Sequence, residues 1–400
     1  MKRFQCLSRC ICFCIVILAI TFNGVAQKVR TTQLLSYDTC IFLDLNKSDI
    51  IEVSFDNDSI ISYATYDDSV TLTSINIYNN TSFKMPLRKY MKYLYQICSN
   101  QEYLLVFTKL NYLYNIIDVF LFKKNNNNGY EYVKTMHLDK MYSCREAYFL
   151  NNGTLLVVDG YLSRQKNYNT FYQLVLFDIE EEKEIKRTSP YLELPMTNYF
   201  GPTKLVTVTD NSILFSQKGI YKIYEYDYNL NLIDSFYNKD LKWKTYPKKK
   251  HDKILQQFDE PADRMGIMVQ DAYKHSLISQ LYYNDGKLLV TYFNPYNKCS
   301  ISYDVWQKEN GHWVLKMKSV SDRLEKKFEK VKKYKRLSWL LGDYFFLHKD
   351  RLIVVHNGIP ISQAKQFNMS DKEFEQLEKD YYSEHSDKLL IDIFKIKFEK

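Results

Sequence analysis

The chain has 400 residues, and its 55 Lys and Arg against 47 Asp and Glu give a net charge of +8. Three of these positive charges lie in the first nine residues, so the rest of the chain is only mildly basic. A balance of this size indicates neither nucleic acid nor a membrane surface as a partner.

Residues 1–26 have the pattern of a secretory signal peptide. A basic start is followed by an apolar run over 10–22 and by small residues that end at Ala26. The alternative is an uncleaved membrane anchor, but a spanning helix needs about 20 apolar residues and this run is shorter. We expect cleavage after Ala26, export to the periplasm or exterior of a bacterium, and no transmembrane span in the mature chain, 27–400.

The four cysteines that remain after cleavage are sparse and irregularly spaced: Cys40, Cys98, Cys144 and Cys299. If all are bridged, three pairings are possible, and the sequence leaves them open. The mature chain contains no CxxC, so nothing supports a zinc or redox site.

A polar turn followed by an apolar strand occurs six times in the mature chain, which is the sign of a repeat. The copies are DNDSIISY, NQEYLLVF, NNGTLLVV, TDNSILFS, NDGKLLVT and HKDRLIVV. Their first apolar landmarks are Ile60, Leu104, Leu155, Ile213, Leu288 and Leu352.

A second strand follows each copy and ends on an aromatic residue in five of the six. These second landmarks are Tyr78, Phe122, Phe177, Tyr226 and Trp306, with Ile396 in the sixth copy. With the flanking strands, each repeat makes a four-stranded antiparallel meander.

Six such units predict an all-β fold, a six-bladed β-propeller, because a propeller buries both faces of each blade. Runs such as LLVF, LLVV and LIVV are apolar on successive residues, as burial on both faces requires. The alternative is a pair of unrelated β-sandwich domains. The sixth repeat lacks a fourth strand, so we expect the segment 41–45 to fill that place and close the ring.

The signal peptide, the six turn-and-strand units and the phrase YEYDYNL at 224–230 resemble the exported six-bladed β-propeller proteins of Bacteroidetes. The resemblance implies the fold and a place in the envelope. It carries no catalytic residues.

Unequal landmark spacing predicts three insertions, near 237–275, 318–336 and 357–388, each with a short helical pattern. In up-and-down sheets, connections between second and third strands emerge on the same edge as connections between sheets. All three insertions should therefore project from one face of the ring, with the tight turns on the other.

No GxSxG, HExxH, Walker A, GxGxxG or EF-hand motif occurs, and the seven histidines are scattered. We therefore expect no metal and no cofactor. The ligand-binding residues that we expect on the insertion face are Tyr161, Arg164, Trp243 and Tyr296. Aromatic rings can stack on sugars or peptides while guanidinium and amide groups bond their polar atoms.

The leading functional hypothesis is a non-enzymatic binding or assembly module that recognises a glycan, a peptide or a partner protein of the envelope. The alternative is a propeller-type lyase or hydrolase at the axial channel, for which Asp263 and Arg264 are candidate groups. A buried cluster of ionisable groups at the axis would favour the enzyme, and an open aromatic shelf would favour binding.

Overall fold

The computed structural model describes residues 35–44, 50–55, 60–66, 70–76, 78–79, 81–87, 94–100, 102–108, 116–125, 129–141, 144–162, 170–188, 204–217, 219–257, 275–284, 286–296, 302–320, 344–348, 351–356, 376, 379 and 388–396.

Within these residues the strands form six antiparallel sheets of four strands each. Sheet 1 comprises β2 (Ile50–Phe55), β3 (Ile60–Tyr66), β4 (Val70–Asn76) and β5 (Ser82–Pro86). Sheet 2 comprises β6 (Leu94–Ser99), β7 (Tyr103–Thr108), β8 (Ile116–Lys124) and β9 (Tyr130–Asp139). Sheet 3 comprises β10 (Cys144–Phe149), β11 (Thr154–Leu162), β12 (Thr170–Asp178) and β13 (Lys183–Thr188).

The other three sheets follow the same order along the chain. Sheet 4 comprises β14 (Val206–Val208), β15 (Ser212–Ser216), β16 (Ile223–Asp227) and β17 (Leu232–Phe236). Sheet 5 comprises β18 (Leu277–Asn284), β19 (Lys287–Phe293), β20 (Ser302–Glu309) and β21 (His312–Val320). Sheet 6 comprises β22 (Tyr344–His348), β23 (Arg351–His356), β24 (Lys388–Ile396) and β1 (Leu35–Asp44).

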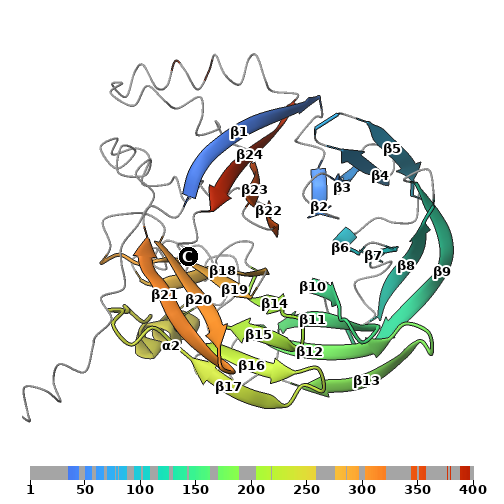
Figure 1. The fold of residues 1–400 in the computed structure, drawn as a ribbon. Coiled ribbons are helices and arrows are strands. Elements are labelled where there is room, and N and C mark those ends of the chain that lie inside the picture. Colours follow the sequence, from blue (N-terminus) through green and yellow to red (C-terminus); the bar gives the residue numbers. More distant parts are fainter. Residues whose placement is uncertain are drawn as a thin grey trace, which may run out of the picture.

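The six sheets surround a common centre, with the first strand of each sheet toward it (Figure 1). These inner strands are β2, β6, β10, β14, β18 and β22. Strand β6 contacts both β2 and β10, and β18 contacts both β14 and β22. This arrangement is consistent with a propeller.

Both faces of the central strands are buried, as the uninterrupted apolar runs predict. In β7, Leu104 and Val106 belong to a core shared with sheet 1, whereas Leu105 and Phe107 belong to a core shared with sheet 3. All four side chains are fully buried. Alternate residues of one strand thus fill the spaces on either side of their sheet.

The strand bounds and register correct one of the second landmarks. In sheets 2 to 5 the apolar landmark pairs with the expected aromatic residue. In sheet 1, however, Ile60 pairs with Asn76, and Tyr78 lies beyond the strand with half of its surface exposed. In sheet 6, Leu352 pairs with Phe394, and β24 ends at Ile396, where the sequence placed the end of that strand. A shift of two residues keeps the same face of a strand, so alternation alone could not reveal it.

Strand β1 completes sheet 6 by pairing with β24 from Leu35↔Ile396 to Asp44↔Lys388, with one bulge. The segment 41–45, which we expected to close the ring, contributes 41–44 to this strand. The closing strand is longer than expected because it begins at Leu35.

Helix α2 (Lys248–Gln257) lies within the expected insertion 237–275. The expected insertion 318–336 begins inside β21, and the expected insertion 357–388 ends where β24 begins. The rest of these two insertions lies outside the described residues, apart from two isolated positions. In the part of the chain that the structure describes, no helix has the length and apolar character to cross a membrane.

Candidate functional site

Trp243, one of the four expected site residues, packs against the core between sheets 4 and 5. Its indole N–H donates to the Gly219 carbonyl at 2.8 Å. Its ring meets the Tyr221 ring edge to face at 5.5 Å and lies 5.9 Å from the Tyr292 ring. Trp243 therefore anchors the segment between β17 and α2, and much of its stacking surface is already used by the protein.

Tyr296 stands on the connection after β19, and about half of its surface is exposed. The Lys242 ammonium lies 4.5 Å from its ring centroid, a cation–π geometry. The buried Asn294 amide donates to the Lys242 carbonyl at 2.9 Å and accepts from the Ser276 hydroxyl at 3.1 Å. These bonds join the loop after β19 to the segment that carries Trp243.

A fully buried carboxylate, Asp304, lies below this segment. It accepts hydrogen bonds from the Tyr221 hydroxyl at 2.6 Å, the Asn238 amide at 2.8 Å and the Tyr292 hydroxyl at 3.0 Å. The Trp306 indole in turn donates to the Tyr221 hydroxyl. Burial, and then the charge of Asp304, hold the pKa of Tyr221 well above its usual range. The network fixes the segment after β17 onto sheet 5.

The structure thus brings Trp243 and Tyr296 onto one connected platform through Lys242, but it does not extend that platform to the other two expected residues. Tyr161 pairs with Phe171 in β11 and β12, and the position of its side chain lies outside the description. Arg164 falls between these strands, also outside the described residues.

The groups expected for an axial enzyme, Asp263 and Arg264, likewise lie outside the described residues. His275 is buried against the Tyr246 ring at 4.8 Å. Across the described residues, no group of three His, Cys, Asp or Glu side chains could hold a metal ion.

A second polar cluster, which the sequence did not predict, lies on the inner strands. Glu146 of β10 is almost completely buried. Its carboxylate accepts the Tyr148 hydroxyl at 2.5 Å and the Leu205 N–H at 2.9 Å, and Tyr148 also donates to the Val206 carbonyl at 2.7 Å. Side chains of sheet 3 therefore hydrogen-bond to backbone groups at the inner edge of sheet 4. Burial raises the pKa of Glu146 to about 7, although these bonds and Lys204 lower it in part.

Lys204 lies just before β14, and its ammonium is 5.4 Å from the Tyr148 ring centroid and 5.7 Å from that of Tyr282 on β18. Burial lowers the pKa of Lys204, and the charge of Glu146 acts in the opposite direction. Burial also raises the pKa of Tyr148 well above its usual range, as does Glu146. Groups from sheets 3, 4 and 5 thus interact near the common centre.

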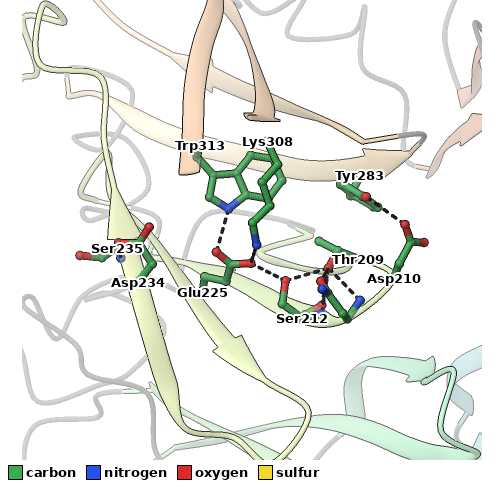
Figure 2. A network of polar contacts seen from close by, with 10 residues as sticks. Thr209, Asp210, Ser212, Glu225, Asp234, Ser235, Tyr283, Lys308 and Trp313 are labelled. Carbon is green, nitrogen blue, oxygen red and sulfur yellow. Dashed lines mark hydrogen bonds and ion pairs between the residues drawn. The ribbon is translucent and has the colours of Figure 1, made fainter. Parts of the chain in front are cut away.

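A third network joins sheets 4 and 5 around the buried Glu225 (Figure 2). Its carboxylate accepts the Ser212 hydroxyl at 2.6 Å, the Lys308 ammonium at 2.7 Å and the Trp313 indole at 2.9 Å. The Thr209 and Ser212 hydroxyls lie 2.7 Å apart. Both Glu225 oxygens are engaged by the protein itself, so this network fastens the two sheets together.

Comparison with solved structures finds chains of similar fold. A member of the DUF4221 family from Bacteroides vulgatus superposes with a TM-score of 0.53 at 12% identity, over 92% of this chain and all of that chain. A luciferin-regenerating enzyme gives a TM-score of 0.44 at 9% identity, over 90% of this chain and 97% of that one. The β-propeller domain of the Trilobed protease from Pyrococcus furiosus gives 0.37 at 12% identity, over 76% and 88%. No family model matches the chain, and a search of curated proteins finds no match either.

Proposed function

We propose that the chain is an exported six-bladed β-propeller that acts as a non-enzymatic binding or assembly module. Its target would be a glycan, a peptide or a partner protein of the envelope. The proposed contact surface is the face on which the sheet-to-sheet connections emerge, with short helical insertions along it. Export rests on the signal-peptide pattern of residues 1–26.

The observation that carries this proposal is the exposed Tyr296 ring beside Lys242, on a platform fixed by buried hydrogen bonds. A preorganised aromatic ring and cation lose little entropy when they contact a ligand. Tyrosine combines an apolar face with a polar tip, which suits both sugar rings and peptide groups. Trp243, next to Lys242 in the chain, anchors that segment to the core.

The test compares a Lys242→Ala/Tyr296→Ala double variant with the wild-type mature protein, each immobilised and exposed to envelope extract. Proteins and polysaccharides retained on the support are measured separately. We expect retention to fall at least about tenfold, since contacts at the centre of a binding surface contribute 1–2 kcal/mol each. The melting temperature should barely change, because both side chains lie at the surface.

Tyr78→Ala is the matched control. Tyr78 is as exposed as Tyr296 but belongs to the tight turn between β4 and β5, at the opposite end of the strands. Its removal should leave retention unchanged. Equal retention by the double variant, or loss of retention in Tyr78→Ala alone, would place the contact surface elsewhere.

A second candidate function, a propeller-type lyase or hydrolase, is favoured by one observation at the axis. Glu146 has a pKa near 7 beside a tyrosine hydroxyl and a lysine, as a general acid or base requires. Against it, the carboxylate is already held by the backbone of sheet 4. If Glu146→Gln abolished a polysaccharide lyase or hydrolase activity of the purified protein while leaving retention intact, the enzyme would be preferred.

A further inference from the structure

Lys204 is half-buried at the inner edge of sheet 4, as is Tyr148, whose ring centroid lies 5.4 Å from the Lys204 ammonium. The side chains around them are buried: Glu146, Gln280 and Tyr282. A molecule that approaches from the common centre would therefore meet a cation flanked by two tyrosine rings. The group that a cation recognises best at such a place is an anion with hydrogen-bond acceptors, such as a carboxylate.

Gln280 provides an independent indication of a ligand. Lys204 and Gln280 form a parallel backbone bridge, and the Leu281 N–H donates to the Lys204 carbonyl at 2.8 Å. Residues paired across parallel strands project their side chains to the same side, so the Gln280 amide lies beside the Lys204 side chain. The Gln280 side-chain oxygen is buried and has no hydrogen-bond donor among the described residues. A buried acceptor of this kind costs free energy until a donor reaches it.

We propose that Lys204 and Gln280 form a binding site for a small carboxylate that also carries a hydroxyl group, a hydroxy acid or sugar acid. The carboxylate pairs with the Lys204 ammonium, and the hydroxyl donates to the Gln280 oxygen. The Tyr148 ring provides a flat surface for the carbon skeleton. This site is separate from the Tyr296 platform and goes beyond the proposed function.

Glu146 gives the site a pH dependence with a defined sign. An ionised Glu146 repels a bound carboxylate, and a protonated one does not. Affinity should therefore rise as the pH falls through about 7, where Glu146 takes up a proton. The other titratable groups in the cluster are Tyr148, Lys204, Tyr282 and Cys98, and Glu146→Gln isolates the contribution of the carboxyl group from theirs.

The experiment measures binding of glucuronate to the mature protein by calorimetry at pH 6 and pH 8. Glucose, which lacks the carboxylate, and acetate, which lacks the hydroxyls, are the matched probes. We expect glucuronate to bind at least about tenfold more tightly than either, because a charge-assisted bond and a neutral bond act together. Affinity should be several-fold higher at pH 6 in the wild type and equal at both values in Glu146→Gln.

Two lysine variants locate the site. Lys204→Met keeps the aliphatic stem and should weaken glucuronate binding at least about tenfold. Lys222→Met is the control, because that ammonium also lies over a tyrosine ring, Tyr224, at 5.0 Å, but away from this cluster. The Lys242→Ala/Tyr296→Ala variant should bind glucuronate normally, so failure of this proposal is distinguishable from failure of the proposed function.

Three results would overturn the site. One is no binding of any probe up to about 10 mM, which would mean that Gln280 is satisfied by water alone. Another is equal binding of glucose and glucuronate. The third is undiminished glucuronate affinity in Lys204→Met. If Lys204→Met failed to fold, the pH dependence of the wild type against Glu146→Gln would decide.

Discussion

The Glu146 carboxyl group lies between sheets 3 and 4, and the free-energy cost of burying its charge there can be measured directly. Its pKa rises from 4.5 to about 7 on folding because the group is buried. The folded protein therefore holds this proton to a higher pH than the unfolded chain does. It follows that the contribution of Glu146 to stability is greatest below pH 4.5 and is lost as the pH rises through 7.

The magnitude follows from the two pKa values. Each pH unit between them corresponds to about 1.4 kcal/mol, so ionised Glu146 at pH 8 costs the folded state about 2–4 kcal/mol relative to pH 4. Glu146→Gln keeps the shape and an oxygen for the Leu205 N–H, and it has no charge to bury. The free energy of unfolding of the variant minus that of the wild type should therefore rise by about 2–4 kcal/mol from pH 4 to pH 8.

The assay is urea unfolding of both mature proteins at several pH values, with the free energies compared pair by pair. All other titrating groups are the same in both chains, so the difference reports Glu146 alone. The exposed Glu180→Gln variant is the control and should give a difference that stays flat with pH. If the difference in free energy of unfolding between Glu146→Gln and wild type also stayed constant with pH, the pKa of Glu146 would not be raised in the folded protein.

Two further predictions concern the links between sheets. Glu225→Ala should lower the free energy of unfolding by about 3–5 kcal/mol, because it leaves the Trp313 indole and the Lys308 ammonium without their acceptor. The control for urea unfolding is Glu309→Ala, at the exposed end of β20, which removes only a surface ion pair with Lys316. Deletion of residues 27–44 from the mature chain should cost several kcal/mol, because β24 loses a full ladder of hydrogen bonds, and an unchanged melting temperature would contradict the closure.

The strands could be predicted from the sequence because their signal is local. The same local pattern recurs in most repeats: a turn residue, a run of successive apolar residues and then an aromatic residue. The pattern in each repeat depends only on the burial of that repeat's own strands. The Gly153 turn is one example, since its φ of 84° suits glycine in the NNG phrase. This local signal does not fix the register between strands, because a two-residue shift leaves every side chain on the same face, as the pairing of Ile60 with Asn76 instead of Tyr78 shows.

The sites were harder to predict because their residues meet only in three dimensions. Trp243 is a residue type that often stacks on ligands, yet Tyr221, just before β16, and Tyr292 of β19 already contact its ring. Glu146 and Gln280 belong to no motif. The one available signal was a polar residue directly before an apolar run in an inner strand, as in REAYF and SQLYY, which marks a buried polar group without naming its partner.

The pairing of β1 with β24 can form only after β24 has been synthesised, so it is a late step of folding. A ribosome makes β1 first and its partner last, so β1 waits unpaired while five sheets are synthesised. Such a long separation in sequence makes this contact a slow step of folding. During that interval the edge strands of sheet 6 are open to pairing with another chain. Dilution or a chaperone that covers β1 should therefore improve the yield of refolded monomer more than any change within sheets 2 to 5.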